Sequence, residues 1–344
     1  MRLFKLVKNI LCDENSIKDI DEVIFEKGFE QYKKDGQYNE LAYYSMINLF
    51  CKTNGEYLDR KHREISKSYT IKKLEGIINS CIGELDSKEI YGYVSKLNLE
   101  GYSIFENKIP EDLLKNLETF MLTHKCKYAR DKESVVFDQN NILSEVYRFE
   151  SHDVISNPDV QKLIMDPGLM EIARQYLGCE PIFDFAAMWI STAFSPEASD
   201  DAAQLYHFDL DRIKWLKIFV YINDVNEEQG PHYYIEGSHL TGAKPQYLLD
   251  RGYVRISDDE ILKNYPKNKV KNITGKAGAV FAGDTKCWHK GTPVIKGKRM
   301  VLQLEYTANL FGGNVPKSKI YNYSPGFKDF FHDNPYYFTN CELV

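Results

Sequence analysis

From Pro181 onward, the chain is built of short apolar runs separated by Gly, Pro and Asn turns, and no other feature restricts its fold as much. The runs are "PIFDFAAMWISTAF", "WLKIFVYINDV", "HYYIEGS", "GAVFAGD" and "KRMVLQLEYTANLF". Short strands without long helices between them are typical of antiparallel sandwiches and barrels. We therefore predict a mainly β fold, with helices elsewhere in the chain.

The first part of the chain, residues 1 to about 95, has a helical pattern instead. The segment "SIKDIDEVIFEKGFEQYKKDG" carries an apolar stripe at Ile17, Ile20 and Ile24 and ends at Gly36. We predict two more helices over "NELAYYSMINLFCKTNG" and "SKSYTIKKLEGIINSCIGEL". This region contains no motif with recognisable chemistry. We interpret it as a helical N-terminal extension that packs on the core or contacts a partner, including a second copy in a homo-oligomer.

The pattern changes near residue 96, where we place the start of the main domain, residues 96–344. A strand is predicted at Tyr102–Phe105, followed by a helix. Asn157 and Asp166 each precede a proline and are predicted to cap two short helices, the second of which ends at Gly178. The polar segment 241–268, with one helix at Asp258–Asn264, is predicted to be an insertion between two strands.

The overall composition excludes several classes of protein. The 344 residues carry a net charge of −6, so no global basic field indicates nucleic acid as a partner. No apolar run reaches the length of a membrane span. The seven cysteines are scattered and form no CxxC pair, which is typical of reduced thiols in a cytoplasmic protein. We expect a small-molecule substrate, with no nucleic acid and no membrane involved.

His207 and Asp209 stand at the start of the second apolar block. Side chains two residues apart point the same way on an extended strand, so this pair can hold one metal ion. Two imidazoles and one carboxylate on one face of Fe(II) leave open positions for a chelating cosubstrate and O₂. In a chain with eight His the spacing alone is weak. A surface His beside a surface Asp is the alternative.

A second constellation lies in "GKAGAVFAGDTKCWHKGTPVIKGKRMVLQLEYT", residues 275–307. His289 ends one strand-like run, and Arg299 begins the next. A dicarboxylate such as 2-oxoglutarate can chelate a metal at one end, while its far carboxylate needs a cation, and a guanidinium fits best. Arg299 could instead be a surface residue beside Lys296 and Lys298. The apolar strand that it begins favours a buried position.

These blocks resemble the phytanoyl-CoA dioxygenase family of Fe(II)/2-oxoglutarate-dependent oxygenases. The resemblance is carried by "HFDLDR", "YINDVNEEQGPHYYIEGSH", "AGDTKCWHKGTP" and "GKRMVLQLEYT", and it covers roughly residues 96–312. It implies a double-stranded β-helix, the jelly-roll or cupin-like barrel, with supporting helices. It also implies Fe(II) as cofactor and 2-oxoglutarate and O₂ as cosubstrates.

Matched to the family motif, His207, Asp209 and His289 are the metal ligands and Arg299 anchors the cosubstrate carboxylate. Thr292 lies near the place where the family often has a hydroxyl for the same carboxylate. Halogenating relatives lack the metal-binding carboxylate. Because Asp209 is present, the resemblance favours hydroxylation or a related oxidation.

Three further residues near the motif are candidates for substrate contact: Asp211, Arg212 and His232. An ordinary surface ion pair is the alternative for Asp211 and Arg212. Cys287, two residues before His289, is interpreted as a wall residue, although a cysteine at this spacing could also ligate a metal.

The function predicted from the sequence is a non-haem Fe(II)- and 2-oxoglutarate-dependent dioxygenase that hydroxylates, or otherwise oxidises, a polar small molecule. A sugar or sugar nucleotide of bacterial glycan or metabolite biosynthesis is our expectation for the substrate. An acyl-CoA is less favoured, because no basic cluster for its phosphates is evident. Two other classes stay open. One is a cupin-type metal-dependent isomerase or lyase, and the other is a non-catalytic jelly-roll binding protein.

Overall fold

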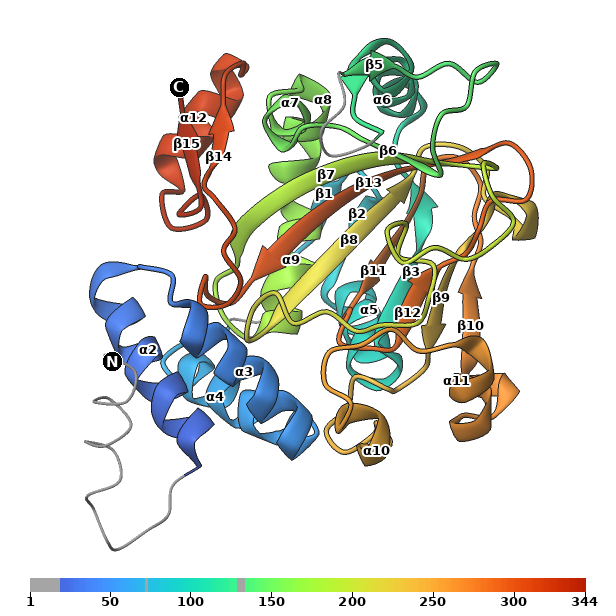
Figure 1. Cartoon of the computed structure of the whole chain (residues 1–344). Helices are drawn as coiled ribbons and strands as arrows, with labels where there is room; N and C mark the ends of the chain where they lie inside the picture. Colours follow the sequence, from blue (N-terminus) through green and yellow to red (C-terminus); the bar gives the residue numbers. More distant parts are fainter. Residues whose placement is uncertain (1–18, 72–73, 129–133) are drawn as a thin grey trace, which may run out of the picture.

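The computed structural model describes residues 19–71, 74–128 and 134–344. Within them, the largest element is a six-stranded antiparallel sheet (Figure 1). Its strands, in spatial order, are β3 (Tyr102–Lys108), β11 (Ala279–Gly283), β8 (Trp215–Tyr221), β13 (Lys298–Thr307), β7 (Ile182–Thr192) and β6 (Val146–Arg148).

A smaller antiparallel sheet completes the barrel. Its order is β10 (Val270–Ile273), β9 (His232–Ile235) and β12 (His289–Gly291). Side chains from both sheets form one interior cluster, including Phe219, Tyr221 and Phe281 from the large sheet and Tyr234 and Ile273 from the small one. The predicted mainly β jelly roll with supporting helices is therefore confirmed.

The two-residue period of the strands separates two environments. In β8, Leu216, Ile218 and Val220 pack into the main core with the supporting helices. Phe219 and Tyr221 point the other way, into the barrel. The supporting elements are α5 (Ser87–Glu100), α6 (Glu111–Thr123), α7 (Ser151–Ile155), α8 (Pro158–Ile164), α9 (Pro167–Leu177) and α12 (Pro325–Asp333).

Several predicted elements are confirmed. The side chains of Asn157 and Asp166 cap α8 and α9, and α9 ends at Gly178 in the left-handed conformation. The remaining short strands are β4 (Lys125–Cys126), β5 (Val135–Val136), β14 (Ser318–Ile320) and β15 (Cys341–Leu343).

The helix predicted over residues 66–85 is wrong. The structure places a hairpin there, with strands β1 (Ile78–Ser80) and β2 (Gly83–Leu85). Gly76 and Gly83 have φ angles of 84° and 102°, which a right-handed helix cannot include. The next helix, α5, begins only at Ser87 and spans the predicted domain boundary at residue 95.

The N-terminal extension contains α2 (Ile20–Asp35), α3 (Glu40–Thr53) and α4 (Glu56–Ser66). The first two match predicted helices, and Gly36 ends α2 as expected, whereas Ile17 of the predicted stripe lies outside the described residues. Sequence reasoning did not predict α4. The extension shares a hydrophobic cluster with the barrel: Phe50 of α3 lies 5.2 Å, ring to ring, from Phe208.

The segment 241–268 lies between β9 and β10 and carries α10 (Gln246–Leu249) and α11 (Asp258–Asn264), the second as predicted. Two short 3-10 helices, η1 (Glu227–Gln229) and η2 (Lys267–Lys269), complete the secondary structure of the described residues. Six cysteines lie in this part of the chain, all as free thiols. None of the described helices is long and apolar enough to cross a membrane.

The contact between extension and barrel gives a first prediction. Phe50 is 2% exposed, so Phe50→Ala should lower the free energy of unfolding by about 3–5 kcal/mol, through lost burial and the cavity left behind. Urea denaturation measures this. Tyr44→Ala on the same helix is the control, because Tyr44 is 54% exposed and should change the stability little. Equal effects of the two substitutions would contradict the packing described here.

Candidate metal and cosubstrate site

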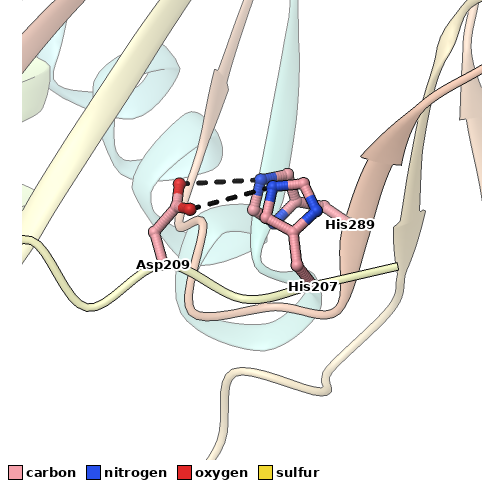
Figure 2. A group of neighbouring side chains, drawn as sticks. All are labelled: His207, Asp209 and His289. Atoms are coloured by element: carbon pink, nitrogen blue, oxygen red, sulfur yellow. Dashed lines mark ion pairs between the residues drawn. The ribbon is translucent and has the colours of Figure 1, made fainter. Parts of the chain in front are cut away.

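The side chains of His207, Asp209 and His289 lie close together, with one possible ligand atom from each within 4.8 Å of the others (Figure 2). His207 and His289 are paired by two backbone hydrogen bonds, of 3.0 and 2.8 Å, between neighbouring segments. The backbone N–H of Asp209 donates to the carbonyl of Thr285 at 2.8 Å. The two chain segments that carry the three side chains are therefore held together by their backbones.

Both imidazoles are oriented by carbonyl groups. Nδ1 of His207 lies 2.9 Å from the Leu205 carbonyl, and Nδ1 of His289 lies 3.0 Å from the Cys287 carbonyl. Because a carbonyl can only accept, each Nδ1 carries the proton and each Nε2 presents a lone pair. Burial lowers the pKa of His207 to about 3 and also lowers that of His289, so both rings are neutral at pH 7.

The carboxylate of Asp209 faces both lone pairs. Its Oδ1 is 3.8 Å from Nε2 of His207, and its Oδ2 is 3.6 Å from Nε2 of His289 (Figure 2). Burial alone would raise the pKa of Asp209, but the Lys217 ammonium opposes this most strongly, and that pKa lies well below the usual range. Two neutral imidazoles and one carboxylate are a ligand set suited to non-haem iron.

A cavity of about 330 Å³ opens beside these three side chains. Arg299, on β13, reaches it from the large sheet and is 2% exposed. Its Nη2 donates to the Ser191 hydroxyl at 3.3 Å, while Nε and Nη1 are buried without a partner among the described residues. A buried guanidinium with two unpaired donor atoms is costly unless an anion binds there.

The wall opposite Arg299 is shaped to leave it room. A Cβ on Gly291 would lie 2.8 Å from Nη2 of Arg299, so a larger residue would displace the guanidinium. Gly291 is in β12, two residues after His289, and lines the same cavity. Metal ligands, cation and free space therefore coincide, and a carboxylate of a metal-chelating dicarboxylate fits this arrangement.

His232 lines the cavity between the metal ligands and Arg299. The Tyr221 hydroxyl donates to the Ile273 carbonyl and lies 2.9 Å from Nδ1 of His232. Since that hydroxyl has one proton, Nδ1 must be the donor to it. Burial and the Arg299 charge hold the pKa of His232 well below its ordinary value, so the ring is neutral.

Arg212 requires a correction, because the structure does not bring it to the cavity. Its guanidinium forms two hydrogen bonds, of 2.6 and 2.8 Å, with Asp184 of β7, and it also donates to the carbonyls of Leu310 and Gly313. The buried pair ties β7 to the segment after β13. The proposed surface pair with Asp211 is also absent, since Asp211 contacts Lys217 instead.

Thr292 also departs from the expectation. Its hydroxyl donates to the Pro231 carbonyl at 3.0 Å, and it is not among the residues that line the cavity. The hydroxyl beside Arg299 belongs to Ser191 on β7. The thiol of Cys287 lies 3.5 Å from Nδ1 of His239 and is not part of the metal-binding group found in the described residues.

Sequence reasoning missed several residues that the fold places in the cavity. They include Lys217, Gln303, Trp189 and Phe219. A signal was present for two of them. Lys217 is the only charged residue of β8, a strand that is buried throughout, and Gln303 stands between two buried leucines in β13. A polar side chain at such a position must face a polar or functional interior.

Fold and site together define a jelly-roll protein in which three side chains that could hold a metal ion share a cavity with a buried guanidinium that has unpaired donor atoms. The family model "Phytanoyl-CoA dioxygenase (PhyH)" matches residues 97–300, more than half of the chain. The chain therefore belongs to the phytanoyl-CoA dioxygenase family, as its motifs implied. It is by class a non-haem Fe(II)/2-oxoglutarate-dependent enzyme, and Fe(II), 2-oxoglutarate and O₂ are the cofactor and cosubstrates of that class.

The solved structures that this chain resembles share little sequence with it. HygX from Streptomyces hygroscopicus, solved with nickel and 2-oxoglutarate bound, is 14% identical over 64% of this chain and 88% of its own, with a TM-score of 0.47. EctD from S. alaskensis, solved with 2-oxoglutarate and 5-hydroxyectoine, is 19% identical over 65% of this chain and 79% of its own, with a TM-score of 0.45. No curated protein matches the chain.

The buried histidines give a second prediction. Burial lowers the pKa of His239 to about 4, although Asp284 nearby opposes the shift. The unfolded chain then binds one more proton between about pH 4 and 6.5, so acidification through this window destabilises the fold by about 1.4 kcal/mol per pH unit. His239→Gln should remove that part of the slope. Urea denaturation between pH 7 and 4 measures it.

The control is His332→Gln, which replaces an exposed histidine of α12. If the free energy of unfolding of His239→Gln falls with pH as steeply as that of the parent protein, the conclusion that His239 is neutral in the folded state is refuted.

Proposed function

We propose that this protein oxidises a compact polar molecule, by hydroxylation, with Fe(II) held by His207, Asp209 and His289 and with 2-oxoglutarate anchored by Arg299. The observation that carries the proposal is the conjunction of two features in one cavity. Three ligand atoms lie within 4.8 Å of one another, and a buried guanidinium has two unpaired donor atoms.

The bound iron and cosubstrate would supply the oxidising chemistry, activating O₂ at the expense of 2-oxoglutarate. The chain's own residues hold the cosubstrate and the metal in position. Arg299 would neutralise the far carboxylate through charge-assisted hydrogen bonds, with the Ser191 hydroxyl beside it. The carbonyls of Leu205 and Cys287 keep both Nε2 lone pairs directed at the metal.

The cavity walls support a small ring-shaped substrate with polar groups. Trp189, Phe185 and Phe219 provide flat apolar surfaces, and Lys217 and Gln303 provide hydrogen-bonding groups. The C–H face of a sugar ring stacks on such surfaces while its hydroxyl groups bind polar side chains. We therefore keep a sugar or sugar nucleotide as the proposed substrate class. His232 is a candidate substrate contact, as is Asp211 at the edge of the site.

The two alternative classes are less consistent with Arg299. A cupin-type isomerase or lyase needs a metal but no cation for a cosubstrate carboxylate. A non-catalytic binding protein would have no reason to keep an unpaired guanidinium buried beside three metal ligands, since the group costs stability. In both cases a substitution of Arg299 by an apolar residue would be neutral or stabilising.

The test is spectroscopic and anaerobic. Adding Fe(II) and then 2-oxoglutarate should produce a weak metal-to-ligand charge-transfer band in the visible range. Asp209→Ala should abolish the band. Arg299→Met should raise the 2-oxoglutarate concentration needed for it by about 100-fold, as expected for losing a charge-assisted pair worth roughly 2–3 kcal/mol.

Lys298→Met is the matched control, because Lys298 is a neighbouring cation on the same strand whose ammonium lies 6.0 Å from the Phe137 ring, away from the cavity. It should titrate like the parent protein. A folded protein that binds iron but gives no band would remove 2-oxoglutarate from the mechanism and favour the cupin-type alternative. With the band established, succinate release would score a panel of sugars and sugar nucleotides.

A further inference from the structure

Lys217 occupies an unusual place for a lysine. It lies in β8, a strand whose seven residues are all buried, and its side chain is 9% exposed. It lines the cavity beside the metal ligands. Its ammonium is 2.7 Å from Oδ2 of Asp209, 3.1 Å from Oδ2 of Asp211 and 3.4 Å from Oε2 of Glu305. One cation thus faces three carboxyl groups.

These three carboxyl groups do not share the cation equally. Glu305 is fully buried, and its Oε2 is the most distant of the three oxygens from the ammonium, with no hydrogen bond between them. The ammonium charge is therefore divided between Asp209 and Asp211. Asp211 is the more exposed of the two, with 35% of its side chain accessible, and water weakens its hold on Lys217. Asp209 has the shorter contact.

The contact with Lys217 distinguishes the two oxygens of Asp209. Both oxygens face an imidazole, Oδ1 that of His207 and Oδ2 that of His289, but only Oδ2 also accepts a hydrogen bond from the ammonium, at 2.7 Å. A carboxylate whose two oxygens are both free can bind a metal through both and occupy an additional coordination position. A carboxylate with one oxygen engaged offers the other alone.

We propose that Lys217 is a positioning residue that holds Oδ2 of Asp209, so that this carboxylate binds iron through Oδ1 alone and donates less charge to it. The inference rests on the proposed function, since it concerns the same metal. Hydrogen bonds to a metal-bound carboxylate tune the metal as well as the ligand's orientation. Three coordination positions then stay open for the cosubstrate and O₂.

Asp211 competes with Asp209 for the ammonium of Lys217. It draws the ammonium away from Asp209, and removing its charge should strengthen the contact between Lys217 and Asp209. Substitutions of Lys217 and Asp211 should therefore shift the electron density at the metal in opposite directions. A merely structural ion pair would not produce this pattern.

The experiment records the anaerobic charge-transfer band of the Fe(II)–2-oxoglutarate complex for Lys217→Met, Lys217→Arg and Asp211→Asn. In Lys217→Met, a more electron-rich iron gives up an electron at lower energy, so the band should move to longer wavelength. The 2-oxoglutarate dissociation constant should rise about tenfold, because a cation near a bound dianion is lost. Lys217→Arg should restore both properties, and Asp211→Asn should move the band to shorter wavelength.

Lys61→Met is the matched control. Lys61 is also 9% exposed at its side chain and also pairs with two carboxylates, Glu26 and Glu64, but it lies in α4 of the extension. It should leave the band unchanged. A second readout is the visible absorption of the Co(II)-substituted protein without cosubstrate, whose intensity reports coordination number. Two-oxygen binding of Asp209 in Lys217→Met would raise that number and weaken the absorption.

The outcomes separate the two proposals. No band in the parent protein would refute the proposed function itself. A normal parent band that stays at the same wavelength in Lys217→Met and in Asp211→Asn would refute only the role of Lys217. If Lys217→Met does not fold, the Asp211→Asn band decides: a shift to shorter wavelength supports the inference, and an unshifted band overturns it.

Discussion

The two-residue alternation of the central strands is the constraint on which the site depends. In β13, Met300, Leu302 and Leu304 pack into the core beneath the helices, while Arg299 and Gln303 face the cavity. Pairing with β8 places Gln303 opposite Phe219 and Glu305 opposite Lys217. A slip of one residue would turn every charged side chain into the apolar layer. The same burial that stabilises the fold therefore specifies which residues can reach the metal.

The polar interior that results is costly to the fold without its ligands. Arg299 has two unpaired donor atoms, and Glu305 is buried with no hydrogen-bond partner for either oxygen among the described residues. Such groups weaken a fold unless a ligand compensates them, and a ligand that binds only the folded state stabilises it by mass action. The unpaired polar groups therefore lie around the candidate site. Functional sites are where proteins are expected to depart from ideal packing.

Sequence reasoning reached the parts of the site that are local in the chain. His207 and Asp209 are two residues apart, and His289 and Arg299 flank one turn, so spacing and family resemblance were sufficient to nominate them. Lys217 could have been noted as a charged residue in an apolar strand, but its partners at positions 209, 211 and 305 could not, because only the fold brings them together. Arg212 was misassigned for the same reason: its partner Asp184 is on β7, 28 residues away. Long-range pairing of charges leaves no pattern in a single sequence.

The N-terminal helices also support the site, although they precede the region that matches the family model. That region begins at residue 97. The ammonium of Lys244 lies 5.4 to 5.7 Å from the rings of Phe50, Phe208 and Trp288. Phe208 and Trp288 are chain neighbours of metal ligands, whereas Phe50 belongs to α3. An ion pair from Asp59 of α4 to Lys286 supports the same loop. These helices therefore back the two segments that carry the proposed metal ligands, and without them Phe208 would lose one of its packing partners, Phe50, and the site its support from that side.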